Sequence, residues 1–257
     1  MIIYKTLDEI KKIKKANEII ARLFEDVLPK YIKAGISTYE IDQIAEDYIR
    51  TEGAIPGTKG YDIGSPYPPY PAATCISVNE TVVHGIPNKK HILKEGDIIS
   101  VDTVAVLDGF YGDAAITYPV GKIDRESAKL LEVTEKARDL GITFAKEGNR
   151  IGDISHAIQQ YVESFGFSLV RDFAGHGVGK KMHEDPMVPN FGKSGTGPKV
   201  ENGMVIAIEP MVNIGKFPVR ILDDMWTVVT KDKSRSAHFE HSVAIIDGKP
   251  LILSVKD

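Results

Sequence analysis

Two stretches of the sequence, KAGISTYEIDQIAEDYIRTEGAI (33–55) and KEGNRIGDISHAIQQYVESFGFS (146–168), align with each other without gaps. The positions that they share are Gly35 with Gly148, Ile41 with Ile154, Tyr48 with Tyr161, and Gly53 with Gly166. Self-similarity of this kind is typical of a duplicated fold. We therefore predict two related half-repeats, approximately 1–122 and 123–257, that share one core in a single domain.

Each half continues from helices into strands. An amphipathic pattern of helical period precedes each copy of the repeat, over 7–32 and over 126–145. Downstream, LKEGDIISVDTVAVL (93–107) is echoed by KVENGMVIAIEPMVN (199–213). The strand-like runs of the second half are not separated by a helix long enough for a crossover, which favours antiparallel pairing. The sequence therefore predicts an α+β fold, with a curved antiparallel sheet backed by helices and pseudo-two-fold halves.

A two-residue turn, Asp108-Gly109, joins the strand-like runs IISVDTVAVL and FYGDAAITYPV. Counting back from this turn places Asp102 opposite Ala115, with Asp113 diagonally beside Asp102 on the same face. Diagonal neighbours lie about 7 Å apart, so two buried carboxylates at these positions would need a cation between them. Exposure of both to solvent is the alternative, but Asp102 interrupts an apolar run, where an exposed position would be unusual.

Two glutamates of the second half stand in similar surroundings. Glu209 ends the apolar run MVIAIEP and falls opposite Asp102 in the repeat, and Glu240 begins another apolar run in HFEHSVAII. Four carboxylates within core-like strands are costly to ionise unless cations compensate them, and two divalent ions would balance all four. Taken alone, each glutamate is as well explained without a metal.

The segment FAGHGVGKKMHEDP (173–186) places two histidines among glycines. The spacing excludes a Walker phosphate loop and a dinucleotide fingerprint, because Lys180 stands where each motif requires a glycine. His176, with a glycine on each side, is a candidate metal ligand, and the glycines would allow close approach to metal and peptide. His183 is a candidate hydrogen-bond donor to a substrate. A surface histidine paired with one of the two acidic residues that follow it is the alternative.

Composition limits the functional classes. The chain has 257 residues, a formal net charge of −4 and one cysteine, Cys75. This balance of charge does not favour nucleic acid as a partner, and a single cysteine excludes a disulfide framework. No long apolar run or secretory signal is present, so we expect a cytoplasmic protein with no membrane partner. The lysines of KKIKK (11–15) are expected on the solvated face of the first helix.

With these residues identified, the sequence resembles the methionine aminopeptidases, specifically their type I form. The matching segments span most of the chain and are VVHGIP (82–87), VDTVAVLDGFYGDAA (101–115), GHGVGKKMHEDP (175–186), IEPMVN (208–213) and WTVVTKDKSRSAHFEHSVAI (226–245). The resemblance implies the duplicated "pita-bread" fold and a single catalytic domain over residues 1–257.

The resemblance also implies a site for two divalent metal ions, of Co, Mn, Fe, Zn or Ni. The implied ligands are Asp102, Asp113, His176, Glu209 and Glu240, with Asp113 and Glu240 bridging. In the family, a hydroxide activated by the two metals attacks the first peptide bond and releases the initiator methionine of nascent proteins with a small second residue. The implied catalytic residues are Glu209, which handles the proton, His183, which contacts the carbonyl oxygen, and His84, which contacts the amide of the leaving side.

An apolar pocket for the methionine side chain is implied as well. Its residues, in addition to the substrate contacts of His84 and His183, are Cys75, Tyr70, Met182 and Trp226. The segment GYDIGSPYPPYPAATC (60–75) is longer than is usual in the family, so Tyr61 and Tyr67 compete with Tyr70 for a place in the pocket. A site for one monovalent cation, Na or K, is implied at Asn79, Thr81 and Ser236.

Two other functions share the fold. An X-Pro aminopeptidase or prolidase uses the same metal set, but those enzymes place a whole domain before the ligands, whereas here the first half-repeat accounts for the residues that precede Asp102. A non-catalytic interaction protein of the same fold would have lost ligands. The expected partners are peptide substrates and nascent polypeptide chains, with transient ribosome contact, and we expect a monomer.

Overall fold

The computed structural model describes residues 1–256. Its α-helices are α1 (Leu7–Arg22), α2 (Thr38–Thr51), α3 (Arg125–Phe144) and α4 (Ile151–Ser164). Its strands are β1 (Ile55–Pro56), β2 (Thr74–Val78), β3 (Thr81–Val83), β4 (Ile98–Leu107), β5 (Phe110–Pro119), β6 (Ser168–Leu169), β7 (Gly175–Gly177), β8 (Glu184–Val188), β9 (Val205–Ile208), β10 (Met211–Asn213), β11 (Val219–Ile221), β12 (Val228–Thr230), β13 (Ser236–His238), β14 (Glu240–Ile246) and β15 (Lys249–Ile252). Within these residues, no helix has the length and apolarity needed to span a membrane.

The repeated stretches form equivalent helices. In the gapless alignment, the first residues of α2 and α4 match each other, as do their last residues, and each helix has 14 residues. A capping box starts α2, because the Ser37 side chain accepts from the Glu40 N–H while the Glu40 carboxylate accepts from the Ser37 N–H. Asp153 plays the part of Glu40 at the start of α4. The duplication seen in the sequence therefore corresponds to a structural repeat.

The first helix is less regular than its sequence pattern predicts. The α-helix ends at Arg22, and a π-helical turn (Leu23–Val27) and a 3₁₀ turn (Leu28–Lys30) continue it. Pro29 accounts for the change, since it has no N–H and its ring excludes the carbonyl four residues before it. Of the four lysines in the basic run, Lys11, Lys12 and Lys15 are exposed, as predicted, and Lys14 is half-buried.

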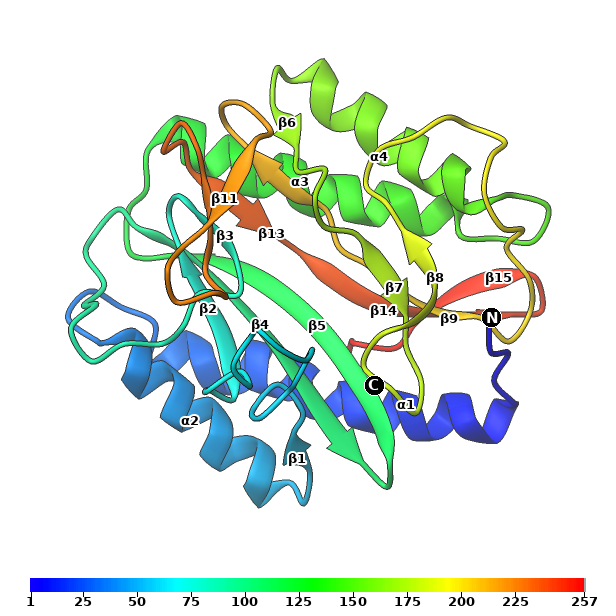
Figure 1. Ribbon diagram of the computed structural model, residues 1–257, viewed down its shortest axis with the longest axis horizontal. Coiled ribbons are helices and arrows are strands. Elements are labelled where there is room, and N and C mark those ends of the chain that lie inside the picture. Colours follow the sequence, from blue (N-terminus) through cyan, green and yellow to red (C-terminus); the bar gives the residue numbers. More distant parts are fainter. Residues whose placement is uncertain (257) are drawn as a thin grey trace.

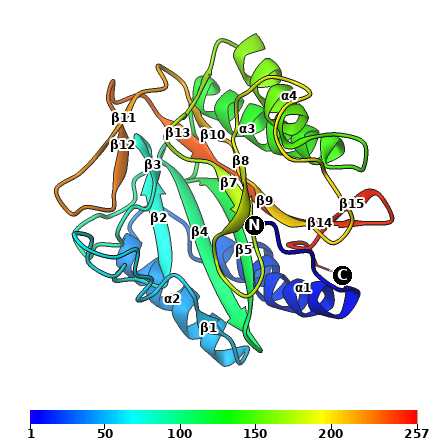
Figure 2. The ribbon, with the colours of Figure 1, turned by 45° about the vertical axis from the view of Figure 1, so that its right-hand side comes forward.

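One antiparallel sheet joins the two halves. Its strand order is β1-β4-β5-β14-β9-β7-β8, with β2 added beside β4 and β15 beside β14. The halves meet where β5 pairs with β14, through Glu240 with Ala115 and His241 with Ala114. In Figure 1, α1 and α2 lie at the bottom of the view, and α3 and α4 lie at the top. Figure 2 shows the same separation of the two helix pairs from a second direction.

The hairpin β4–β5 has the predicted register. Leu107 pairs with Phe110, Asp102 pairs with Ala115, and the ladder continues to Pro119 without a shift. Asp108 and Gly109 have φ angles of 51° and 78°, as a type I′ turn requires. Asp102 and Asp113 therefore share a face of the sheet.

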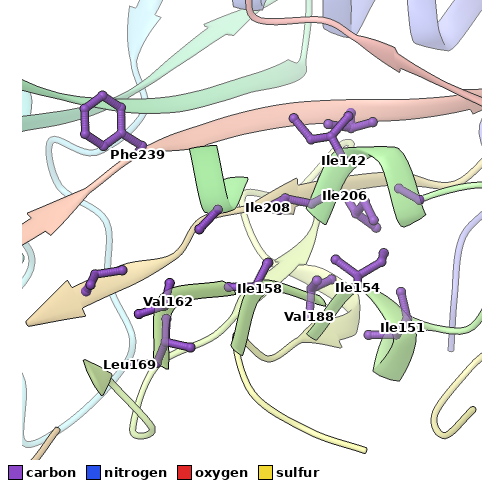
Figure 3. Packing of buried hydrophobic residues seen from close by; sticks show 14 of the residues in the cluster. Ile142, Ile151, Ile154, Ile158, Val162, Leu169, Val188, Ile206, Ile208 and Phe239 are labelled. Atoms are coloured by element: carbon purple, nitrogen blue, oxygen red, sulfur yellow. The ribbon is translucent and has the colours of Figure 1, made fainter. Parts of the chain in front are cut away.

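The core lies between the sheet and the helices. In the second half, Ile154 and Ile158 of α4 pack with Val188 and Ile206 of the sheet (Figure 3). In the first half, the apolar residues of α1 and α2 form a cluster with strand residues such as Val101. Because side chains alternate along a strand, Asp102 points to the opposite face, away from these helices.

Candidate metal centre

Five neighbouring strands bring the predicted ligands together. Asp102 lies on β4, Asp113 on β5, Glu240 at the start of β14, Glu209 directly after β9, and His176 on β7. These strands follow one another in the sheet in that order. All five side chains line a single cavity of about 240 Å³. The residues were predicted from separate segments, and the fold places them at one site.

The distances within this group suit a shared cation. His176 Nε2 lies 3.7 Å from Asp113 Oδ2 and 3.5 Å from Glu209 Oε1. One atom each of Asp113, His176 and Glu240 lie within 4.8 Å of one another. Carboxylate oxygens with one imidazole nitrogen form a donor set typical of divalent transition metals. Glu240 Oε1 is also buried without a hydrogen-bond partner in the protein, which a metal ion would satisfy.

The backbone around His176 fixes its orientation. Nδ1 bonds to the carbonyl of Gly177 at 2.9 Å, so Nε2 is the nitrogen that faces the carboxylates. A Cβ on Gly175 would lie 2.3 Å from the Ala207 carbonyl oxygen, and one on Gly177 would lie 2.2 Å from that of Asp185. The glycines therefore allow the neighbouring strands β9 and β8 to approach. Their predicted part in the close approach of metal and peptide stays a prediction.

The carboxylates are held in an unfavourable electrostatic environment. Burial raises the pKa of Asp102 to about 6. Burial, and then the neighbouring carboxylates, raise the pKa of Asp113 and of Glu240 well above the ordinary range. Divalent cations would relieve both the desolvation and the mutual repulsion. The buried carboxylates therefore favour the binding of cations at this site.

Glu209 differs from the other three carboxylates. Burial raises its pKa, but His238, and then the charge of His176, outweigh burial, and the net pKa is lowered. His238 is 2% exposed and places Nε2 3.4 Å from Glu209 Oε2. Sequence reasoning missed His238 as a site residue. Its position two residues before Glu240, a spacing that places side chains on one face of an extended strand, is the signal that could have identified it.

Two neutral histidines stand beside the carboxylates. Burial lowers the pKa of His84 and of His183 to about 4. The ring of His183 lies edge-on to that of His176 at 4.3 Å, and its Nδ1 bonds to the Tyr61 hydroxyl at 2.5 Å. The ring of His84 packs edge-on against Phe173 at 5.5 Å. Both histidines line the cavity, as do Tyr61 and Phe173, whose contacts with them the sequence did not reveal.

An apolar cluster also lines the cavity. Tyr70, Cys75 and Trp226 form one buried cluster, and Met182 lines the cavity with them. Cys75 pairs with Asp102 across β2 and β4, which places the cluster next to the carboxylates. The Tyr70 hydroxyl donates to the Gly85 carbonyl at 2.9 Å.

The long Pro-Tyr segment borders this apolar cluster. The Trp226 indole N–H donates to the Pro68 carbonyl at 2.8 Å and so attaches the segment to the cluster. Tyr61 and Tyr70 both line the cavity. Tyr67 is not among the lining residues of the described chain, although its ring lies 6.3 Å from that of Trp226.

The residues proposed for a monovalent cation lie together outside this cavity. The Ser236 N–H donates to the Asn79 carbonyl at 2.8 Å. Thr81, in β3, pairs with Val229 of β12. The Ser236 hydroxyl is buried and has no hydrogen-bond partner within the described residues.

Comparisons with known proteins agree with this geometry. The chain is 50% identical to the methionine aminopeptidase of Clostridium acetobutylicum over 255 residues, 99% of each chain, and 51% identical to methionine aminopeptidase 1 of Bacillus subtilis over 247 residues, 96% of each. The crystal structure of methionine aminopeptidase from Thermotoga maritima superposes with a TM-score of 0.95, at 45% identity and 100% coverage of both chains. These findings confirm the family resemblance and the predicted pita-bread fold.

A more distant likeness extends to another enzyme of this fold. The prolidase from Pyrococcus furiosus gives a TM-score of 0.77 at 22% identity, with 99% of this chain and 66% of that one covered. That likeness shows the fold alone. The family model described as Metallopeptidase family M24 matches residues 11–247. With that match and relatives at half identity over nearly the whole chain, the protein belongs to metallopeptidase family M24.

Proposed function

We propose that the chain is a type I methionine aminopeptidase that removes the initiator methionine from nascent polypeptides with a small second residue. One observation carries the proposal. A single cavity is lined by five candidate metal ligands, an apolar cluster and two neutral histidines. This arrangement suits a substrate with a free amino terminus, one unbranched apolar side chain and a peptide bond between them.

Two divalent ions complete the proposed site. Asp102, Asp113, His176, Glu209 and Glu240 would hold them. One imidazole among carboxylates suits Mn, Fe or Co and tolerates Zn or Ni. When bound, such ions supply Lewis acidity and make water nucleophilic near neutral pH.

Side chains of the protein bind the substrate and transfer the proton. His183 is neutral at physiological pH, with Nδ1 engaged by Tyr61. If Tyr61 donates this bond, His183 Nε2 carries the proton and donates to the carbonyl oxygen as negative charge develops there. Glu209 keeps a lowered pKa and can accept a proton from water and pass it to the leaving amine. His84 binds the amide on the leaving side.

The apolar cluster accounts for the selectivity. Trp226, Tyr70 and Met182 offer aromatic and thioether surface, which methionine sulfur contacts favourably. Cys75 is buried, and burial raises the pKa of its thiol well above the ordinary value, so it remains neutral. A charged or polar first residue would lose its hydration here without a partner.

The proposed setting is the cytoplasm, where the protein would act as a monomer on nascent chains, with transient contact to the ribosome. A Na or K ion bound at Asn79, Thr81 and Ser236 would satisfy the buried Ser236 hydroxyl. Size-exclusion chromatography and metal analysis of protein purified without chelator would test the oligomeric state and the metal content.

Cleavage of short peptides tests the proposal against its rivals. With added Mn²⁺, we expect release of methionine from Met-Ala-Ser, far slower release from Met-Leu-Ser, and no cleavage of Leu-Pro peptides. EDTA should abolish the activity. Tight metal binding without cleavage of Met-Ala-Ser would contradict the aminopeptidase function and favour an interaction protein. Preference for the Leu-Pro peptide would favour an X-Pro peptidase.

A further inference from the structure

A buried ion pair lies beside the candidate site and outside the ligand set. Lys5 Nζ contacts Glu184 Oε2 at 2.7 Å, and the two side chains are only 4% and 3% exposed. Lysine is among the residues that are least often fully buried. The start of the chain runs beside β8 and β9 (Figures 1 and 2), so this pair joins the amino-terminal segment to the first residue of β8.

Glu184 holds together the turn that precedes it. Its Oε1 accepts from the backbone N–H groups of Lys180 at 2.9 Å and Lys181 at 3.2 Å. A Cβ on Gly179 would lie 2.4 Å from the same oxygen. The turn 179–183 is therefore folded around this carboxylate, and a side chain at Gly179 would displace it.

This turn carries two residues of the cavity. His183 directly precedes Glu184, and Met182 precedes His183. The turn connects β7, which holds His176, to β8. The Tyr111 N–H also donates to the Gly179 carbonyl at 2.9 Å, which ties the start of the turn to β5. The rest of the turn is held by the hydrogen bonds from the Lys180 and Lys181 N–H groups to Glu184.

Lys5 is fixed independently of the turn. Its backbone N–H donates to the Gly203 carbonyl at 2.7 Å, and its ammonium also donates to the Ile3 carbonyl at 2.8 Å. The Gly203 N–H in turn donates to the Ile245 carbonyl at 2.9 Å, on β14. Lys5 is thus anchored beside the start of β9 and the end of β14, two strands that have Glu209 and Glu240 at their opposite ends. The ion pair spans from that frame to the turn with His183.

We propose that Lys5 and Glu184 are positioning residues that hold the His183 imidazole at its place in the cavity. This inference rests on the proposed function, in which His183 contacts the substrate carbonyl. The sequence left open that His183 itself pairs with the acidic residue after it. Instead, Glu184 bonds to Lys5 and to the backbone, which leaves the His183 ring free to face His176 and Tyr61.

A mutant cycle with His183 tests the proposal. In Lys5→Met we expect kcat to fall roughly 10- to 100-fold, because displacement of a catalytic group by about 1 Å can cost that much, while KM changes little. In a His183→Ala background, Lys5→Met should change kcat less than about twofold, because residues that act through one group are not additive. Equal reductions in both backgrounds, or full activity of Lys5→Met, would overturn the proposal.

Matched variants separate positioning from stability. Lys136→Met removes a lysine that bonds Glu132 at 2.6 Å on the exposed surface of α3, and it should leave kcat unchanged. If Lys5→Met does not fold, the double variant Lys5→Met/Glu184→Gln replaces the pair without leaving a buried charge. We expect the double variant to show the same loss of kcat in the wild-type background, and a change in kcat of less than about twofold in the His183→Ala background.

A spectroscopic readout distinguishes this inference from the proposed function. In histidine-labelled, Zn²⁺-loaded protein, Lys5→Met should shift or broaden the NMR signals of His183, while those of the distant His156 on α4 remain in place. Unchanged His183 signals would contradict the positioning role, whether or not the protein cleaves peptides. A wild-type protein that fails to release methionine, with His183 shifted in the variant, would contradict only the proposed function.

Discussion

The two histidines of the 173–186 segment have different partners although their rings lie 4.3 Å apart. Nδ1 of His176 is hydrogen-bonded to the backbone carbonyl of Gly177, so that Nε2 faces the carboxylates. Nδ1 of His183 is hydrogen-bonded to the Tyr61 hydroxyl instead. In the proposed function, the partner of Nδ1 decides the role of Nε2, which would be a metal ligand in His176 and a donor to substrate in His183.

Tyr61 tests this assignment. In Tyr61→Phe, His183 loses the partner that fixes its tautomer, so we expect kcat to fall about tenfold, less than the roughly 100-fold cost of removing a transition-state donor itself. Steady-state hydrolysis of Met-Ala-Ser gives the value. Tyr67→Phe is the matched control and should retain the wild-type rate. Equal activity of both variants would show that the bond from Tyr61 to His183 has no part in the reaction.

The ligand residues could be predicted because each interrupts a local pattern. Asp102 and Asp113 break apolar strands, and the hairpin count gave their common face, which the structure confirms. Tyr61 gave no such signal, and for His238 the only local signal is its spacing of two residues from Glu240. Their roles depend on contacts with Glu209 and His183, which are distant in the sequence, and no local period encodes those contacts.

At the scale of elements, α1 supports the β4–β5 hairpin, which carries two of the candidate metal ligands. Asn17 of α1 is 0% exposed, and its Oδ1 accepts from the Asp113 N–H at 3.1 Å. The Asp113 carbonyl accepts from the Ser242 hydroxyl at 2.7 Å. Both backbone groups of this ligand therefore depend on side chains from other elements.

Removal of the Asn17 amide should weaken both the fold and the site. Asn17→Ala leaves the buried Asp113 N–H without its acceptor, which costs about 1 to 3 kcal/mol in the free energy of unfolding. Because Asp113 can then shift, metal affinity should fall as well. Urea unfolding and a metal titration measure the two effects. Asn202→Ala, on the exposed surface, should change stability by less than about 0.5 kcal/mol. Unaltered metal affinity of Asn17→Ala would refute this supporting role of α1.

The repeated helices and the hairpin were predictable, since their signals are local. The helices α2 and α4 lie at equivalent positions within the aligned repeat, and α3 begins and ends within one residue of its predicted range. The short strands β6, β7 and β11 were not predicted. Strands of two or three residues carry no detectable period, and their conformation is imposed by the neighbours with which they pair.

At the scale of the whole molecule, the buried carboxylates lower the free energy of unfolding of the metal-free protein when they ionise. Burial raises the pKa of Asp102 from 3.8 to about 6, and the pKa values of Asp113 and Glu240 are raised further above their ordinary range. A carboxyl group with a raised folded pKa contributes stability below its unfolded value, and that contribution is lost as pH rises through the folded value. In the metal-free protein, ionisation of Asp102 therefore destabilises the fold increasingly as pH rises from 3.8 to about 6, and ionisation of Asp113 and Glu240 acts in the same direction.

Metal binding should reverse this loss. Surface carboxylates contribute equally with and without metal, so the difference in Tm between the Mn²⁺-bound and metal-free protein isolates the site. We expect this difference to be larger at about pH 7.5 than at about pH 5, because protons compete with metal for the same oxygens at the lower pH. Differential scanning calorimetry at both pH values measures it. A gain in Tm that does not depend on pH, or that is larger in acid, would argue against a carboxylate metal centre.

The central claim is that the five converging side chains form the metal centre that removes amino-terminal methionine. The most direct test measures bound Mn²⁺ and methionine release from Met-Ala-Ser in the same samples of wild-type protein and Asp113→Ala. We predict that the wild type binds metal and releases methionine. Asp113→Ala should keep its circular dichroism spectrum, bind less metal and release methionine at a rate near background. A folded Asp113→Ala variant that releases methionine at the wild-type rate would contradict the claim.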